Sequence, residues 1–286
     1  MKNKSFGRDT GLQTRILITF FLLGALYVVF VGVLFAAGAG GVTIAVIAGG
    51  LLLVQLFLSD KIGLAAAGAR EVSPAQAPEL HAMIERLCVQ ADLPKPKVAI
   101  VQTSMPNAFA MGRSRKAATV VATTGIMELL TPAELEAVVG HELAHVAHRD
   151  AAVMTVVGGP GAVLLQGGAK IARGWPMGIG GLVAMAVGWL GSLGGRILSR
   201  YREFAADAGA VALTGNPVAL ASALTKVSGG LVAIPSRDLR AVAARDAFHL
   251  LPVAPAGEYK LPATHPPLRA RIERLQRMEA TLQSAR

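Results

Sequence analysis

The stretch TPAELEAVVGHELAHVAHRD, residues 131–150, combines the signals of a helix start with side chains that can carry out chemistry. Thr131, followed by Pro132 and Glu134, is typical of an N-cap, a first-turn proline and a capping-box acid. Apolar residues then recur at helical spacing, at Leu135, Val138, Val139, Leu143 and Val146. The sequence therefore predicts a helix through this stretch.

This predicted helix carries His141 and His145 one turn apart on the same face, with Glu142 beside the first of them. Two neutral imidazoles at this spacing can bind one metal ion, and Glu142 can act as general base toward a water molecule there. These side chains are the minimal set for zinc-assisted hydrolysis. A surface helix that carries the five-residue pattern by chance is the alternative.

The composition is too apolar for an ordinary soluble enzyme, with 53% hydrophobic residues and a mean hydropathy of +0.51. Residues 16–59 contain no charged side chain, and this length suffices for two helices of about 20 residues each. Small residues at 36–41 divide the run, which predicts a transmembrane hairpin at 16–59 after a cytoplasmic tail at 1–15. A signal peptide over residues 1–39 is the alternative, but a second apolar segment follows it directly.

Two more uncharged stretches, 151–169 and 174–195, follow the motif and are rich in glycine. They predict a second apolar helical pair at 151–195, which either spans the membrane or packs as a buried hairpin on the catalytic domain. Lysines and arginines beside the spans place both termini and the motif on the cytoplasmic side. Lys170 and Arg173 oppose this bias, so full crossing of the second pair stays open.

The formal net charge of +10 requires no nucleic-acid partner, because cationic flanks beside anionic lipid account for it. The sequence contains no basic stripe interleaved with aromatic residues. The single cysteine, Cys88, excludes an intramolecular disulfide and lies in a helical pattern that favours a core position. The charge pattern thus predicts the lipid bilayer as a partner.

The segments 60–150 and 196–286 are predicted to form the two halves of a catalytic domain. In the first half, residues 74–92 predict a helix in which His81 is expected to be exposed. Strands are predicted at 98–101 and 117–123, and weak alternation marks 107–111 between them. We expect a small sheet beside the motif helix, with an edge to which a substrate can add as a further strand.

A catalytic zinc usually takes three ligands from the protein, and the motif supplies two. Glu203 and Asp207 lie four residues apart and share one face of a predicted helix. One of them can bind the metal while the other holds a ligand or the base in position. The alternative is a solvated amphipathic turn in which Arg202 pairs with lipid. Two histidines and one carboxylate can also hold divalent ions other than zinc.

Four blocks of sequence resemble the HtpX family of membrane zinc metallopeptidases, distant relatives of the prenyl-protein (CAAX) endopeptidases. In chain order they are NAFA at 107–110, HELAH at 141–145, REFAAD at 202–207 and THPP at 264–267. With the two apolar pairs included, the resemblance covers nearly the whole chain. It implies a mainly α membrane protein with a zincin-like α+β catalytic domain, a small β-sheet and about four apolar helices.

The resemblance also implies roles for the residues of the motif blocks. His141, His145 and Glu203 would bind one zinc ion per chain, and Glu142 would be the general base. Substrate would bind along the first block, at Asn107, Ala108 and Phe109.

Three further residues would support this site by resemblance. Asp207 would lie behind the metal ligands as an orienting acid and pair with Arg271. His265 would lie near the zinc and stabilise the developing oxyanion, for which a helix-entry cap is the alternative role.

The resemblance implies an integral, multi-pass zinc endopeptidase of the bacterial cytoplasmic membrane, with its active site facing the cytoplasm. Its substrates would be misfolded or damaged membrane proteins and unfolded proteins, in quality control and the stress response. The alternatives are a sequence-specific processing protease of the prenyl-protein type and a non-catalytic membrane scaffold with a structural metal site. Glu142 argues against the scaffold, because a structural site has no use for a base there. The sequence predicts no particular oligomeric state.

Overall fold

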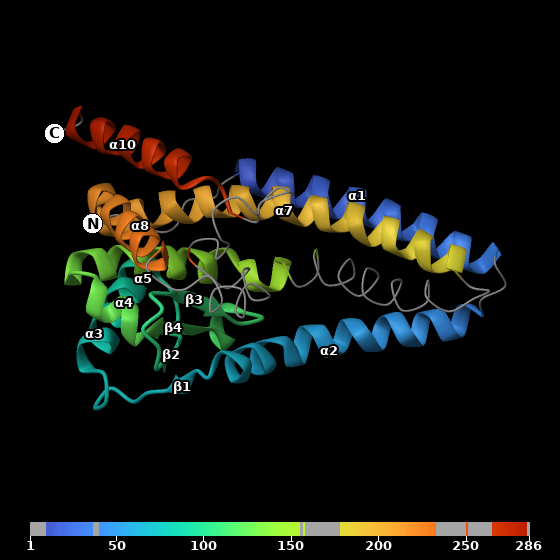
Figure 1. Cartoon of the computed structure of the whole chain (residues 1–286), viewed down its shortest axis with the longest axis horizontal. Coiled ribbons are helices and arrows are strands. Elements are labelled where there is room, and N and C mark those ends of the chain that lie inside the picture. Colours follow the sequence, from blue (N-terminus) through green and yellow to red (C-terminus); the bar gives the residue numbers. More distant parts are fainter. Residues whose placement is uncertain are drawn as a thin grey trace. The chain divides into compact units, whose positions relative to one another are not determined.

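The computed structural model of the chain describes residues 10–36, 40–154, 157, 178–232, 250 and 265–284 (Figure 1). It divides into two compact units, one with Lys61–Ala151 and Arg200–Arg286, and the other with Asp9–Asp60 and Ala152–Ser199. Helix α7 (Gly178–Thr214) is continuous, and its part from Arg200 onward belongs to the first unit.

The two helices expected in the uncharged run at 16–59 are α1 (Thr10–Ala36) and α2 (Gly41–Ala67). By length and composition, however, one helix among the described residues is able to cross a membrane, Leu182–Thr214 within α7, beside a shorter apolar stretch at Leu17–Val28. The expectation of about four apolar membrane helices is therefore not confirmed. Of the second predicted pair, residues 155–156 and 158–177 lie outside the described residues.

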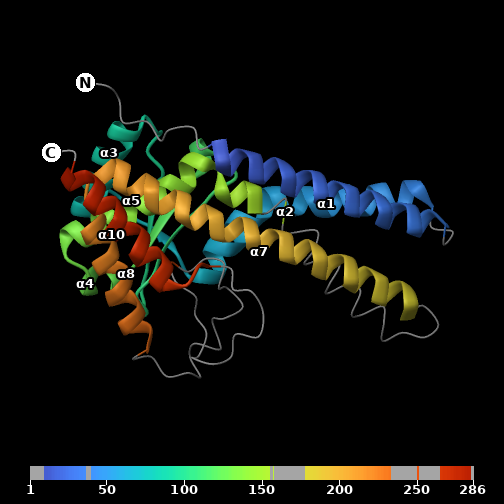
Figure 2. The same ribbon diagram turned by 90° about the horizontal axis from the view of Figure 1, so that it is seen from above.

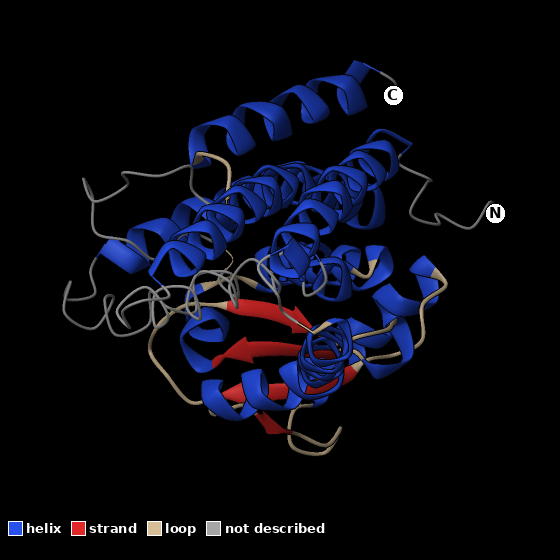
Figure 3. Cartoon of the chain, turned by 90° about the vertical axis from the view of Figure 1, so that its right-hand side faces the viewer, coloured by secondary structure: helices blue, strands red, loops and turns tan. Residues whose placement is uncertain are grey.

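The first unit contains a mixed four-stranded sheet in the order β1-β2-β4-β3 (Figure 3). Its strands are β1 (Arg70–Glu71), β2 (Lys97–Val101), β3 (Ala108–Met111) and β4 (Thr119–Thr123). Val98 of β2 pairs in parallel with Val120 of β4, and Phe109 of β3 pairs antiparallel with Val121. The strands predicted on either side of the NAFA block are confirmed, and the block itself begins the edge strand β3.

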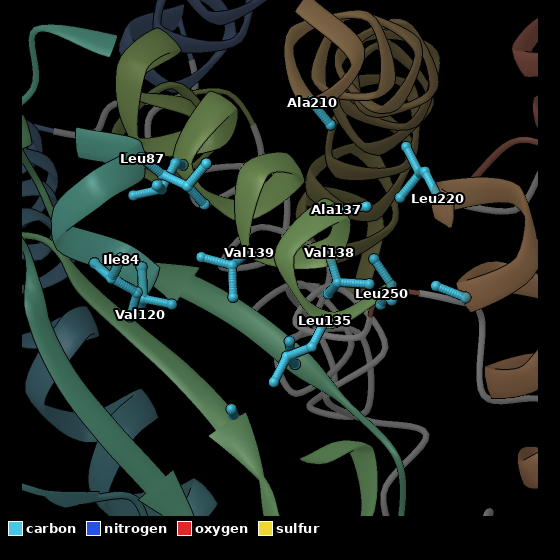
Figure 4. Close-up of a cluster of buried hydrophobic side chains, with 14 of the residues drawn as sticks. Ile84, Leu87, Val120, Leu135, Ala137, Val138, Val139, Ala210, Leu220 and Leu250 are labelled. Atoms are coloured by element: carbon cyan, nitrogen blue, oxygen red, sulfur yellow. The ribbon is translucent and has the colours of Figure 1, made fainter. Parts of the chain in front are cut away.

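Alternating side chains bury both faces of this sheet, as the period of two requires. Val98 and Val120 belong to the main core, which the helices of the unit complete. Ala99, Phe109 and Val121 point to the opposite face, where the end of α2 at Leu64–Ala67 packs against them. Figure 4 shows the main core, with apolar residues of the motif helix between the sheet and the later helices.

The described part of this unit also contains α3 (Pro78–Ala91), α4 (Thr124–Leu129), α5 (Pro132–His148), α8 (Pro217–Val232) and α10 (Leu268–Ser284), with a 3-10 helix η1 (Arg115–Ala117). The motif helix is α5, and the predicted capping box at its start, with Thr131 and Glu134, is confirmed. Helices α8 and α10 lie side by side (Figure 2). The packing of α5 against β3 and α8 holds the motif helix between the sheet and the C-terminal helices.

The helix predicted at 74–92 begins four residues late, at Pro78. Ala77 before this proline is not helical, with φ −142° and ψ 65°, because proline disfavours the helical region for the residue before it. His81 was expected to be exposed, and this was wrong. Only 9% of the residue is exposed, and its Nε2 lies 2.9 Å from the carbonyl oxygen of Val72. Cys88 is buried, as expected.

Candidate metal centre

Three side chains from two helices converge at the buried end of the motif. His141 and His145 come from α5 and Glu203 from α7, and their ligand atoms all lie within 4.8 Å of one another. The two Nε2 atoms are 3.1 Å apart. Glu203 Oε2 lies 3.5 Å from His141 Nε2, and Glu203 Oε1 lies 3.6 Å from His145 Nε2.

A close helix crossing brings Glu203 to the motif. Gly140, the residue before His141, faces α7, where a Cβ on this glycine would lie 3.3 Å from Thr214 Cγ2 and 3.6 Å from the Cα of Ala210. The missing side chain lets the two backbones approach. Glu203 and Asp207 lie one turn apart earlier on α7 and therefore face the two histidines together.

The spacing of the two imidazole nitrogens and the Glu203 carboxylate is close to that around a tetrahedral zinc ion. At ordinary Zn–N and Zn–O lengths, tetrahedral ligand atoms lie about 3.4 Å apart. The two Nε2 atoms are 3.1 Å apart, and each has a different Glu203 oxygen near this distance, Oε2 at 3.5 Å from His141 and Oε1 at 3.6 Å from His145. Two histidines and one carboxylate are also the set found in catalytic zinc sites that keep a fourth position open. The residues present thus fit the metal.

Behind His141 lies the pair of Asp207 and Arg271. Asp207 Oδ1 is 3.0 Å from His141 Nδ1. Arg271 donates to both carboxylate oxygens of Asp207, at 2.6 and 2.9 Å, and its Nη1 lies 3.2 Å from Glu203 Oε2. This is the pairing that the resemblance implied. Because Asp207 occupies Nδ1, the Nε2 of His141 is left to face the metal position.

Behind His145 lies a second pair, Asp150 and Arg202, which the sequence did not reveal. His145 Nδ1 donates to Asp150 Oδ2 at 2.5 Å, and Arg202 Nε lies 2.8 Å from Asp150 Oδ1. Arg202 is only 8% exposed. The alternative in which Arg202 pairs with lipid is therefore wrong.

The charges of the site favour a divalent cation. With both histidines neutral, each aspartate is balanced by its arginine, and Glu142 and Glu203 contribute two further negative charges. Burial lowers the pKa of His141, but the carboxylates of Asp207 and Glu203 outweigh it and raise this pKa to about 9. The carboxylates around His141 thus favour a positive charge at this position.

Glu142 is buried beside these ligands, with 3% of its surface exposed. Burial raises its pKa above the ordinary value, whereas the nearby imidazoles of His141 and His145 act in the opposite direction. A carboxylate with a raised pKa accepts a proton more readily. A raised pKa is one property that a general base requires.

His265 and Asn107 are also buried, and contacts connect both to residues of the centre. His265 Nδ1 lies 3.5 Å from Glu203 Oε1, so the THPP block does reach the third ligand. Asn107 Oδ1 accepts a hydrogen bond from the backbone N–H of Leu250, and Leu250 O accepts one from Arg271. Ala108 and Phe109 follow on β3, and the Phe109 side chain packs into the smaller core.

Comparison with known proteins identifies the family of the chain. Residues 74–279 match the family model described as "Peptidase family M48". A "Protease HtpX homolog" of Moorella thermoacetica is 46% identical over 301 residues, covering 99% of each chain. A "Protease HtpX homolog 2" of Methanosarcina acetivorans is 45% identical over 297 residues, covering 98% of this chain and 99% of the relative.

A solved structure supports the fold. The crystal structure of S. mikatae Ste24p aligns with a TM-score of 0.50 at 16% identity, covering 93% of this chain and 66% of that one. At this identity the likeness concerns the fold alone. The family match and the full-length relatives, together with the cluster of two histidines and a glutamate, lead to one conclusion: the chain belongs to peptidase family M48 and is a metalloprotease related to the HtpX homologues.

Proposed function

We propose that this chain is an integral membrane zinc endopeptidase in which His141, His145 and Glu203 hold the metal and Glu142 is the general base. The observation that carries the proposal is the convergence of these three ligands from two helices, with their ligand atoms within 4.8 Å of one another. Zinc follows from the ligand types and the family, since the same set can hold other divalent ions.

The side chains of the chain divide the work of peptide hydrolysis among them. Bound zinc supplies Lewis acidity toward a water molecule and the substrate carbonyl. Glu142 takes a proton from that water and returns it to the leaving amine nitrogen, for which its raised pKa suits it. His265, at 3.5 Å from Glu203 Oε1, is placed to donate to the oxygen that becomes negative. Asp207 and Arg271 keep His141 and Glu203 in position.

Substrate is proposed to bind along β3, which has one neighbouring strand in the described sheet. The N–H of Thr123 in β4 donates to Asn107 O, so the backbone groups of residues 107, 109 and 111 face β4. Those of Ala108 and Ala110 consequently point away from β4. An extended substrate can pair with them, which positions its peptide bond without reading a particular sequence. Asn107 begins this edge, and the Phe109 side chain supports it from the core.

A membrane location is supported by the apolar helix Leu182–Thr214 and by large apolar side chains that face outward on the described helices. Phe21 is 75% exposed, Val28 73% and Val42 80%. We propose several membrane passes with the site on the cytoplasmic side of a bacterial inner membrane. The substrates that fit such a site are misfolded or damaged membrane proteins and unfolded chains, as in protein quality control.

Two other functions have less support from the site. A sequence-specific processing protease of the prenyl-protein type would need a selective substrate site, whereas the β3 edge offers backbone pairing. A scaffold with a structural metal site would leave the buried carboxylate of Glu142 without a purpose, although burying it has a cost.

The substitution Glu142→Gln tests the proposal, using the full chain purified in detergent. Zinc content should stay at that of the wild type, because Glu142 is not a ligand, whereas casein cleavage should fall about 100-fold or more. The control is Glu136→Gln, two turns earlier on α5, where Glu136 pairs with Arg86 on the surface. Cleavage by Glu142→Gln at the wild-type rate would overturn the role of Glu142 as general base, and a wild-type chain that holds zinc without cleaving casein would favour the scaffold.

A further inference from the structure

The second carboxylate–arginine pair begins with the backbone at the end of the motif helix. Arg149, which follows α5, adopts a left-handed conformation with φ 58° and ψ 38°, rare for a residue other than glycine. Its N–H reaches the carbonyl oxygens of His145 and Val146. The chain is helical again from Asp150 to Met154, and the Asp150 carboxylate meets His145 from five residues further along.

Asp150 is fully buried and uses its two oxygens differently. Oδ2 accepts the hydrogen bond from His145 Nδ1 at 2.5 Å, and Oδ1 forms the ion pair with Arg202 at 2.8 Å. If Asp150 only paired with Arg202, its second oxygen would not need to bind the imidazole of a metal histidine. The strained turn and the buried charges point to a role at the metal site.

A carboxylate lies beside the Nδ1 atom of each metal histidine. His141 is backed by Asp207, which Arg271 of α10 holds, and His145 is backed by Asp150, which Arg202 of α7 holds. In both cases a carboxylate occupies Nδ1, an arginine from another helix fixes the carboxylate, and Nε2 faces the metal position. Arg202 also immediately precedes Glu203 in the chain.

We propose that Asp150 and Arg202 are positioning residues for the second metal histidine and set its distance from Glu203. The hydrogen bond to Asp150 fixes the His145 tautomer that leaves the Nε2 lone pair free, and it increases the basicity of the ring. The ion pair with Arg202 joins the end of α5 to α7 beside the third ligand, where Nε2 and Oε1 lie 3.6 Å apart. This inference rests on the proposed metal function and extends it.

A substitution of Asp150 distinguishes positioning from packing. In Asp150→Asn, Arg202 draws the amide oxygen to its side, which turns the NH₂ group toward His145 Nδ1. That nitrogen must then accept, and the ring proton moves to Nε2, where it opposes metal binding. We expect Zn²⁺ affinity, measured by competition with a chromophoric chelator, to fall about 10- to 100-fold. The Zn²⁺ affinity of Asp207→Asn should fall by a similar factor, and this variant serves as the reference for comparison.

The arginine gives an independent test in case Asp150→Asn does not fold. Arg202→Gln should weaken Zn²⁺ binding, and Arg202→Lys, which keeps the charge beside Asp150, should restore most of it. Glu136→Gln should bind Zn²⁺ as the wild type does. Thermal melting of each metal-free variant shows whether folding is intact, so that an affinity loss without a lower melting temperature identifies positioning.

The possible failures are distinct. Wild-type affinity in both Asp150→Asn and Arg202→Gln, with a loss in Asp207→Asn, would overturn this inference and leave the proposed function in place. Equal losses in Arg202→Gln and Arg202→Lys that follow the melting temperature would also overturn it, because the pair would then be structural. A wild-type chain that binds no Zn²⁺, with a Glu142→Gln variant that still cleaves casein, would instead overturn the proposed function.

Discussion

At the first turn of the motif helix, the carboxylate of Glu134 joins two helices. One oxygen accepts from Ser222 of α8 at 2.6 Å, and the other accepts from the Thr131 N–H and from Lys226, both at 2.8 Å. Burial raises the pKa of Glu134, but the hydrogen bonds from Lys226, Ser222 and Thr131 outweigh it and lower the pKa to about 2. The charged form of Glu134 thus stabilises the fold.

Glu134→Gln should therefore destabilise the protein at neutral pH by about 1 to 2 kcal/mol. Because the folded pKa of about 2 lies below the ordinary 4.5, the stabilisation is complete above pH 4.5 and is lost as the pH falls toward 2. The difference in melting temperature between wild type and variant should shrink over this range. A difference that stays constant down to pH 2.5 would contradict this account.

Of the contacts around Glu134, the sequence predicted those between residues close together in the chain. Thr131 and Glu134 are three residues apart, so the capping box follows from spacing alone. Ser222 and Lys226 lie 88 and 92 residues away, and no local pattern indicates them. The proposed metal ligands likewise include residues that the sequence pattern predicted and one that it did not settle. His141 and His145 follow from helix periodicity, and Glu203 was one of two acids that the residues left open until the resemblance was considered.

Asp150 was missed because its role depends on one backbone conformation. Its carboxylate reaches His145 only through the left-handed turn at Arg149, and arginine is not a residue that signals such a turn. A glycine at that position would have indicated the helix end. The sequence pattern instead predicted that the helix continues without interruption through Arg149.

At the scale of elements, α4 is held against the loop before β3 by a close backbone approach. Gly125 N donates to Thr103 O at 2.9 Å, and a Cβ on Gly125 would lie 2.3 Å from the carbonyl oxygen of Ser104. The atoms nearest to such a Cβ all belong to the Ser104 backbone, so no flexible side chain can move aside. Gly125 thus fixes the junction of β4, α4 and the chain leading to β3.

Gly125→Ala should consequently destabilise the protein by about 2 to 4 kcal/mol, as overpacking against backbone does. Gly229→Ala is the matched control, since nothing lies within 4 Å of a Cβ on this exposed α8 residue. That control should be neutral or stabilising by up to about 1 kcal/mol. Chemical denaturation of both variants measures the difference, and equal stabilities would show that the Ser104 contact does not constrain α4.

The sequence predicted the positions of helices and strands where the hydrophobic periodicity and the turn residues indicated the same boundaries. The strands β2 and β4 lie within a residue or two of their expected bounds, because β-branched runs ended at clear turns. The start of α3 was misplaced, since two prolines competed as the first residue and only Pro78 opens the helix. The pairing order of the sheet has no local signal and came from the structure.

At the scale of the whole molecule, composition predicted a membrane protein more firmly than it predicted the number of spans. The uncharged run at 16–59 does form two helices, yet the criterion of length and apolarity selects Leu182–Thr214 among the described residues. Glycine-rich apolar segments are ambiguous, because buried helical hairpins and membrane spans share their composition.

A washing experiment tests the membrane location of the whole chain. Membranes of cells that express the protein should retain it through high salt and alkaline carbonate, because buried apolar spans resist both, and detergent should release it. Release by salt alone would show that charge holds the chain to the surface, and release by carbonate would contradict integral insertion.

The convergence of His141, His145 and Glu203 on one cation is tested most directly by the metal content of the purified chain and its Glu203→Gln variant. Elemental analysis should find one zinc per chain in the wild type and little in Glu203→Gln. The exposed Glu273→Gln of α10 should keep the full amount. X-ray absorption of the wild-type zinc should show two imidazoles and an oxygen ligand. Full zinc with unchanged coordination in Glu203→Gln would contradict the proposed centre.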